Sequence, residues 1–159
     1  MTDLSLPEFA KSLYARFGVR EACLYLQDEA GCDVVLVLAG AWLGAQGRRL
    51  APLEWRALEQ EAAPWREVVV EPLRSVRRHL KEQSGEPAAG DLRERVQQAE
   101  IQAELHSLQW LEARLAEAGK AEDNALCRNL EAIVGAGMSA VMQRVFRAGV
   151  EDLRRSGLL

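Results

Sequence analysis

Residues 14–44, YARFGVREACLYLQDEAGCDVVLVLAGAWLG, contain the stretch that decides the fold class. Its second half, from Val34 to Gly44, is apolar at almost every position, which is typical of a helix surrounded by others. Gly31 is suited to a left-handed turn, and Asp33 is suited to cap the helix that follows. The stretch therefore predicts two buried helices, near 19–28 and 34–45. A buried strand is the alternative for the apolar run, but its length and helical neighbours favour a helix.

Proline and glycine residues predict further helices on both sides of this corner. Ser5 and Glu8 have capping-box spacing, so a first helix is expected up to about Phe17, which shares an apolar face with Phe9 and Leu13. Two more helices are expected at about 52–63 and 64–81, each opened by a proline. Pro72 lies inside the second of them and should kink or split it.

The second half of the chain predicts a long helix and a two-helix tail. Asp91 with Glu94 forms a second capping-box pattern, and the helix that it starts should extend over about 91–118. Its apolar residues fall on two nearly opposite faces, so it needs packing partners on two sides. Two tail helices are expected near 122–134 and 138–155.

These elements together predict an all-α fold, a multi-helix bundle within a single domain spanning 1–159. An N-terminal bundle is expected over 5–82. The stretch QSGEPAAG at 83–90 has the composition of a linker. The long helix and its tail make up 91–159.

The composition indicates which classes of protein the chain can belong to. Of the 159 residues, 48% are hydrophobic and 28% are charged, which is typical of a globular domain. The net charge of −4 argues against strong non-specific binding to nucleic acid, which needs a basic face. There is no secretion-signal pattern at the N-terminus, and the apolar run is about half as long as a membrane span. A cytoplasmic protein is expected.

Several motifs resemble an uncharacterised family of short proteobacterial proteins, known as a domain of unknown function. The resemblance covers roughly residues 6–118, and its most specific part is the L-Q-x-x-x-G-x-D-V corner. Further matching positions are Phe9-Ala10, Val19, Cys23-Leu24, Trp42, Pro64-Trp65-Arg66, Val69-Val70, Pro72-Leu73-Arg74 and Leu92-Arg93. The first helix departs from the family pattern at Pro7. The resemblance implies a helical cytosolic protein of Gram-negative bacteria and implies no activity, so no functional residues are carried over.

Two aspartates are the first candidates for a metal- or ligand-binding site. Asp28 and Asp33 flank the glycine turn, and such a pair could hold a metal ion or a diphosphate. Enzymes that bind diphosphate in this way use a denser aspartate cluster, and Asp33 already has a capping role. The structural interpretation is therefore favoured.

The histidines, cysteines and tryptophans are weaker candidates for functional residues. His79 and His106 lack the E-x-x-H spacing of di-iron bundles. Cys23 and Cys32 could form a redox pair, but buried reduced thiols are favoured. The sequence predicts no cofactor and no metal site. The four tryptophans are expected to be mainly core residues, and Trp55 and Trp65 are expected to be partly exposed around a turn.

A basic stripe is the strongest candidate for ligand contact. Arg74, Arg77, Arg78 and Lys81 recur at helical spacing, and they could bind phosphate, RNA or an acidic protein. The alternative is a solvated face whose cations complement the helix dipole. Arg48 and Arg49 could extend the stripe.

Spare apolar helix faces favour a function in protein interaction, and a catalytic cluster is not evident. The predicted function is a non-enzymatic interaction or adaptor protein that binds a protein partner or itself. The predicted contact residues are Ile101, Leu105, Leu108, Leu115, Val145 and Phe146. The alternatives are a ligand- or diphosphate-binding protein that uses Asp28 and Asp33, and an RNA- or ribosome-associated protein that uses the stripe at 74–81.

Overall fold

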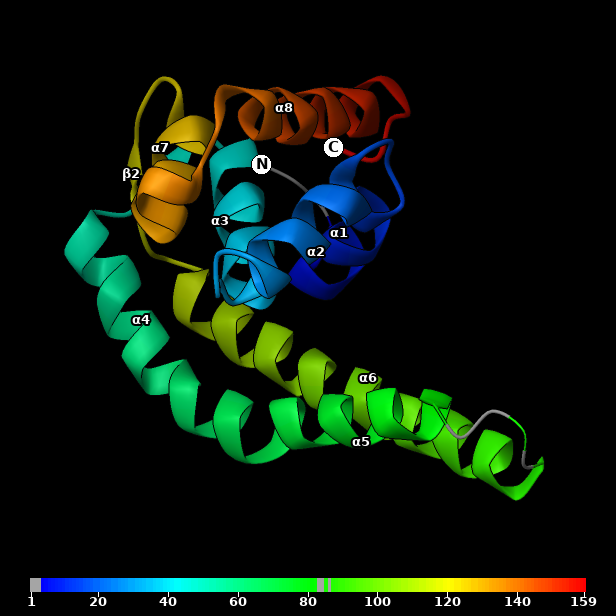
Figure 1. Cartoon of the computed structure of the whole chain (residues 1–159). Coiled ribbons are helices and arrows are strands. Elements are labelled where there is room, and N and C mark those ends of the chain that lie inside the picture. The colour runs from blue at the N-terminus through cyan, green and yellow to red at the C-terminus, as the bar shows by residue number, and fades with distance from the viewer. Residues whose placement is uncertain (1–3, 83–84, 86) are drawn as a thin grey trace. The chain divides into compact units, whose positions relative to one another are not determined.

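The computed structural model describes residues 4–82, 85 and 87–159, and the chain is almost entirely helical (Figure 1). Its elements are α1 (Leu6–Tyr14), α2 (Val19–Asp28), α3 (Val34–Ala45), β1 (Arg48–Arg49), α4 (Pro52–Trp65), η1 (Arg66–Val70), α5 (Glu71–Glu82), α6 (Pro87–Leu115), β2 (Lys120–Ala121), α7 (Ala125–Val134), η2 (Gly135–Gly137) and α8 (Ala140–Arg155). The predicted all-α class, long helix and two-helix tail are confirmed. Over the described residues, no helix has both the length and the apolarity needed to span a membrane.

The chain divides into two compact units. Unit 1 comprises Met1–Ala57 and Leu108–Leu159, and unit 2 comprises Leu58–Ser107. The predicted organisation separates an N-terminal bundle over 5–82 from a long helix and tail over 91–159. The two compact units are bounded elsewhere, because α4 and α6 each extend across a unit boundary. Residues 83, 84 and 86 of the predicted linker lie outside the described residues.

Two predicted helix boundaries are wrong. The long helix starts at Pro87, so Asp91 lies inside α6 and is not an N-cap. Proline fits a first helical position because its missing N–H would have no intrahelical partner there. Pro64 also lies within a helix, near the end of α4, and does not start a new one.

Helix α3 forms the centre of unit 1, with α1, α2, α7 and α8 around it (Figure 1). Its residues from Leu36 to Gly44 are all buried, as the continuous apolar run predicts. Asp33 caps the helix by accepting a hydrogen bond from the Val35 amide at 3.0 Å. The corner that sets the fold therefore forms as the sequence indicates.

Helices α3 and α7 approach closely at two glycines. A Cβ atom on Gly44 would lie 2.8 Å from the Leu126 backbone nitrogen and closer still to its Cα. A Cβ atom on Gly40 would overlap the Cδ1 methyl of Ile133. The spacing of four residues places both glycines on one face of α3, so α7 packs directly on the α3 backbone.

Asn129, on α7, satisfies four backbone or side-chain groups inside unit 1. Its carboxamide oxygen accepts from the Leu50 amide at 3.1 Å and from Trp55 Nε1 at 3.3 Å. Its nitrogen donates to the carbonyls of Gly40 at 3.2 Å and Arg48 at 2.9 Å. Asn129 is fully buried, and a buried amide with every hydrogen bond made orders the groups around it.

A short antiparallel ladder closes unit 1 beside this amide. Arg48 pairs with Ala121, and Arg49 pairs with Lys120. The Arg48 guanidinium donates to the carbonyls of Leu115 and Ala116, each at 3.1 Å, and also to that of Ala118. It therefore satisfies carbonyl groups at the end of α6 that have no helical donor.

Replacing Gly44 with alanine should destabilise unit 1 far more than the same change at Gly40. The added methyl group at Gly44 meets backbone atoms of Leu126, which cannot move without separating the helices, whereas at Gly40 it meets the end of a flexible side chain. We expect Gly44→Ala to lower the free energy of unfolding by about 3 kcal/mol, measured by urea denaturation. Equal losses in the two variants would contradict the close approach of α3 and α7.

Candidate functional site

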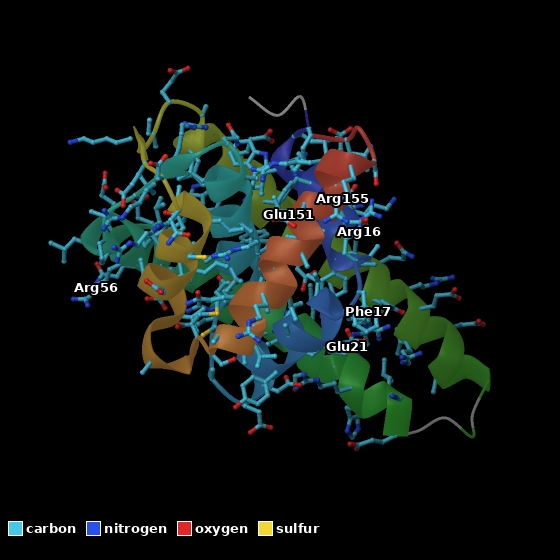
Figure 2. The ribbon with its side chains drawn as sticks, turned by 90° about the horizontal axis from the view of Figure 1, so that it is seen from above. Arg16, Phe17, Glu21, Arg56, Glu151 and Arg155 are labelled. Carbon is cyan, nitrogen blue, oxygen red and sulfur yellow. The ribbon has the colours of Figure 1, made fainter. Side chains whose placement is uncertain are left out.

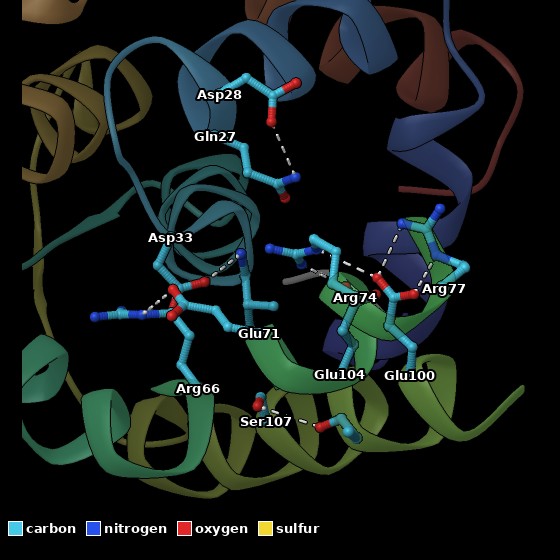
Figure 3. Close-up of polar contacts among 12 residues, drawn as sticks. Gln27, Asp28, Asp33, Arg66, Glu71, Arg74, Arg77, Glu100, Glu104 and Ser107 are labelled. Atoms are coloured by element: carbon cyan, nitrogen blue, oxygen red, sulfur yellow. Dashed lines mark hydrogen bonds and ion pairs between the residues drawn. The ribbon is translucent and has the colours of Figure 1, made fainter. Parts of the chain in front are cut away.

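The predicted aspartate corner is used mainly for structure. Asp33 caps α3, and the exposed Asp28 accepts a 3.5 Å hydrogen bond from the Gln27 side chain (Figure 3). No group of three or more histidine, cysteine, aspartate or glutamate side chains placed to hold a metal ion is present among the described residues.

The three cysteines are thiols and not disulfides. Cys23 is 1% exposed, and burial raises the pKa of its thiol to about 12. Cys127 is also buried, and Cys32 is half-buried. Cys23 is therefore a neutral core residue at ordinary pH, as the structural interpretation predicts.

The basic stripe is partly neutralised within unit 2. Arg74 Nε lies 3.2 Å from Glu100 Oε1, and Arg74 Nη2 lies 3.0 Å from Glu104 Oε1. Arg77 Nε contacts Glu100 Oε2, and this hydrogen bond raises the pKa of Arg77 above its ordinary value. We call these four side chains, drawn in Figure 3, the ion-pair cluster.

Glu100 is the acid on which the ion-pair cluster depends. It is 6% exposed and binds both arginines. A carboxylate that is so buried needs opposite charges nearby to offset its lost hydration. Arg78 and Lys81, the other two residues of the predicted stripe, are exposed. Arg48 and Arg49 do not extend the stripe, since they bind helix-end carbonyls and Glu122 in unit 1.

A π-helical segment, η1, joins α4 to α5 and lies between two prolines. Pro72 has no N–H, so it cannot donate to the Val68 carbonyl as a residue four positions later normally would. The Glu71 amide bonds instead to the Arg66 carbonyl, five residues earlier. The predicted kink or split at Pro72 is therefore resolved by a locally wider helix that remains continuous.

Trp65 joins the end of α4 to α6 within unit 2. Its Nε1 donates to the Ala103 carbonyl at 3.0 Å, and its ring lies 4.3 Å from that of His106, centroid to centroid. Trp65 is 37% exposed, as expected, whereas Trp55 is 2% exposed, contrary to expectation. Trp55 is buried because its indole reaches Asn129. His79 is exposed on α5, with Nδ1 4.0 Å from Glu82.

One flank of the unit 2 hairpin carries a strip of exposed or half-exposed apolar side chains. Leu92, Ala99 and His106 are seven residues apart and so share a face of α6, while Val69, Pro72 and Val76 share a face of the η1–α5 segment. The ion-pair cluster occupies one side of the α5–α6 contact, so these residues fall on the other side. We define the apolar strip as Trp65, Val69, Pro72, Val76 and Leu92.

Two apolar side chains of the apolar strip are about half exposed to solvent. Val76 is 47% exposed and Leu92 is 51% exposed. None of the residues of α5, all of which are described, is buried. The hairpin therefore holds together through Glu100 and its arginines on one flank and leaves apolar area open to solvent on the other.

Unit 1 also has an exposed apolar side chain, that of Phe17. Helix α1 ends at Tyr14, before the predicted boundary, so Phe17 lies off the apolar face and is 100% exposed. Arg16 beside it binds Asp152 at 2.8 Å. Figure 2 labels Phe17 with its neighbour Arg16, and it also labels Glu151 and Arg155 of α8, which form a 3.4 Å ion pair.

The six predicted partner-contact residues have different environments. Leu115 and Phe146 are 0% exposed, so they belong to the core of unit 1 and are not available to a partner. Val145 is half-buried and contacts Gly18, where a Cβ atom would lie 3.3 Å from Val145 Cγ1. Leu105 and Leu108 are half-buried, and Ile101 is 46% exposed.

Sequence reasoning did not identify Glu100 or the apolar strip. Glu100 lies at helical spacing from Val96 and Ala103, at a position where the pattern predicts an apolar residue. An acid at this position was the sequence feature that could have indicated a buried charge. In the sequence, Val69, Leu73, Val76 and Leu80 recur at helical spacing and indicate one packed stripe. The strip becomes visible only when α6 is placed beside α5, since α6 covers one side of that stripe.

The Cys23 thiol should make the protein less stable at high pH. Its folded-state pKa of about 12 is above the ordinary 9.0, so its contribution to stability is complete below pH 9 and is lost as the pH rises toward 12. Within this window the free energy of unfolding should fall by about 1.4 kcal/mol per pH unit from this group. Urea denaturation at successive pH values measures the slope. The Cys23→Ala variant should have a shallower slope, and an unchanged slope would contradict the assignment.

Comparison with known proteins identifies a family. No match was found among curated proteins or among solved structures. The family model described as "Protein of unknown function (DUF2390)" matches residues 5–111, which is more than half of the chain and includes the α2–α3 corner and all of unit 2. The chain therefore belongs to the DUF2390 family.

Proposed function

We propose that this chain is a non-enzymatic helical interaction or adaptor protein of the bacterial cytosol. The observation that carries the proposal is the apolar strip of unit 2, where Trp65, Val76 and Leu92 remain 37 to 51% exposed. Exposed apolar side chains grouped on one face are typical of protein contact sites. The bacterial and cytosolic parts of the proposal rest on the family resemblance and on the reduced state of the three cysteines.

The composition of the strip supports a protein partner. Tryptophan is enriched among the residues that contribute most to protein interfaces, because it combines a large apolar area with few rotatable bonds. Trp65 is held by its hydrogen bond to Ala103 and by the tilted contact of its ring with His106, so its ring loses little freedom on binding. Phe17 offers a second aromatic contact on unit 1.

The two alternatives have less support. Arg74 and Arg77 already bind Glu100 and Glu104, which reduces the positive potential available to RNA. Asp33 uses a carboxylate oxygen to cap α3, which competes with a diphosphate or metal role. Binding of RNA that weakens with salt and with Arg78→Gln and Lys81→Gln would favour the first alternative.

Site-specific photo-crosslinking in bacterial cells tests the proposal. A benzophenone amino acid at Val76 should give discrete adducts, because this position lies in the apolar strip. The same probe at Gln97, which is exposed on α6 outside the strip, is the matched control and should give little product.

Mass spectrometry then identifies what the adducts contain. An adduct with another protein and an adduct with a second copy of the chain would both support an interaction function. Similar, diffuse labelling from Val76 and Gln97 would contradict a specific contact at the strip.

A further inference from the structure

We draw no further inference here: the strongest candidate, the apolar strip on the hairpin of unit 2, carries no proposal because nothing among the described residues shows what covers it.

Discussion

The direct packing of α7 on the backbone of α3 is the constraint on which the structure of unit 1 depends. Gly40 and Gly44 remove the side chains that would keep the helices apart, and Asn129 can then reach the Gly40 carbonyl. From that position the same amide also binds Leu50, Arg48 and the Trp55 indole, so it fixes the chain that leaves α3. Small residues on one helix thus permit a polar contact that specifies the course of the chain from Arg48 to Trp55.

Unit 2 is held together by a different balance of forces. Its two helices are joined by a buried carboxylate and two guanidinium groups, a kind of contact that gives specific geometry but little net stability once desolvation is included. The Trp65 indole adds one directional bond to the α6 backbone. Unit 1 has a continuous apolar core, whereas the buried residues among those described in unit 2 are Val70, Ala103 and Glu100. The hairpin therefore leaves apolar side chains such as Val76 and Leu92 exposed to solvent.

The sequence predicts the elements of this fold whose causes are local. The Asp33 cap, the buried α3 and the separation of the tail helices each depend on a few neighbouring residues, and all three are found. The start of α6 was misplaced because Pro87 and Asp91 both carry start signals, and the earlier one is used. Glu100 and Asn129 could not be assigned roles, since the groups that each of them binds are brought together only by the fold. The same holds for the basic stripe, because Arg74 forms its ion pairs with Glu100 and Glu104, which are more than twenty residues away in the sequence.

The wide turns of η1 have a consequence for how the family can vary in length. A π-helical stretch holds more residues per turn than an α-helix, so loss of one residue between Pro64 and Pro72 would restore ordinary pitch. Everything downstream would then rotate by about 100° about the helix axis. Arg74 and Arg77 would turn away from Glu100, which would be left without its counter-ions. The spacing of the two prolines therefore fixes the rotational position of α5, and we expect insertions or deletions within the seven residues between them to be poorly tolerated.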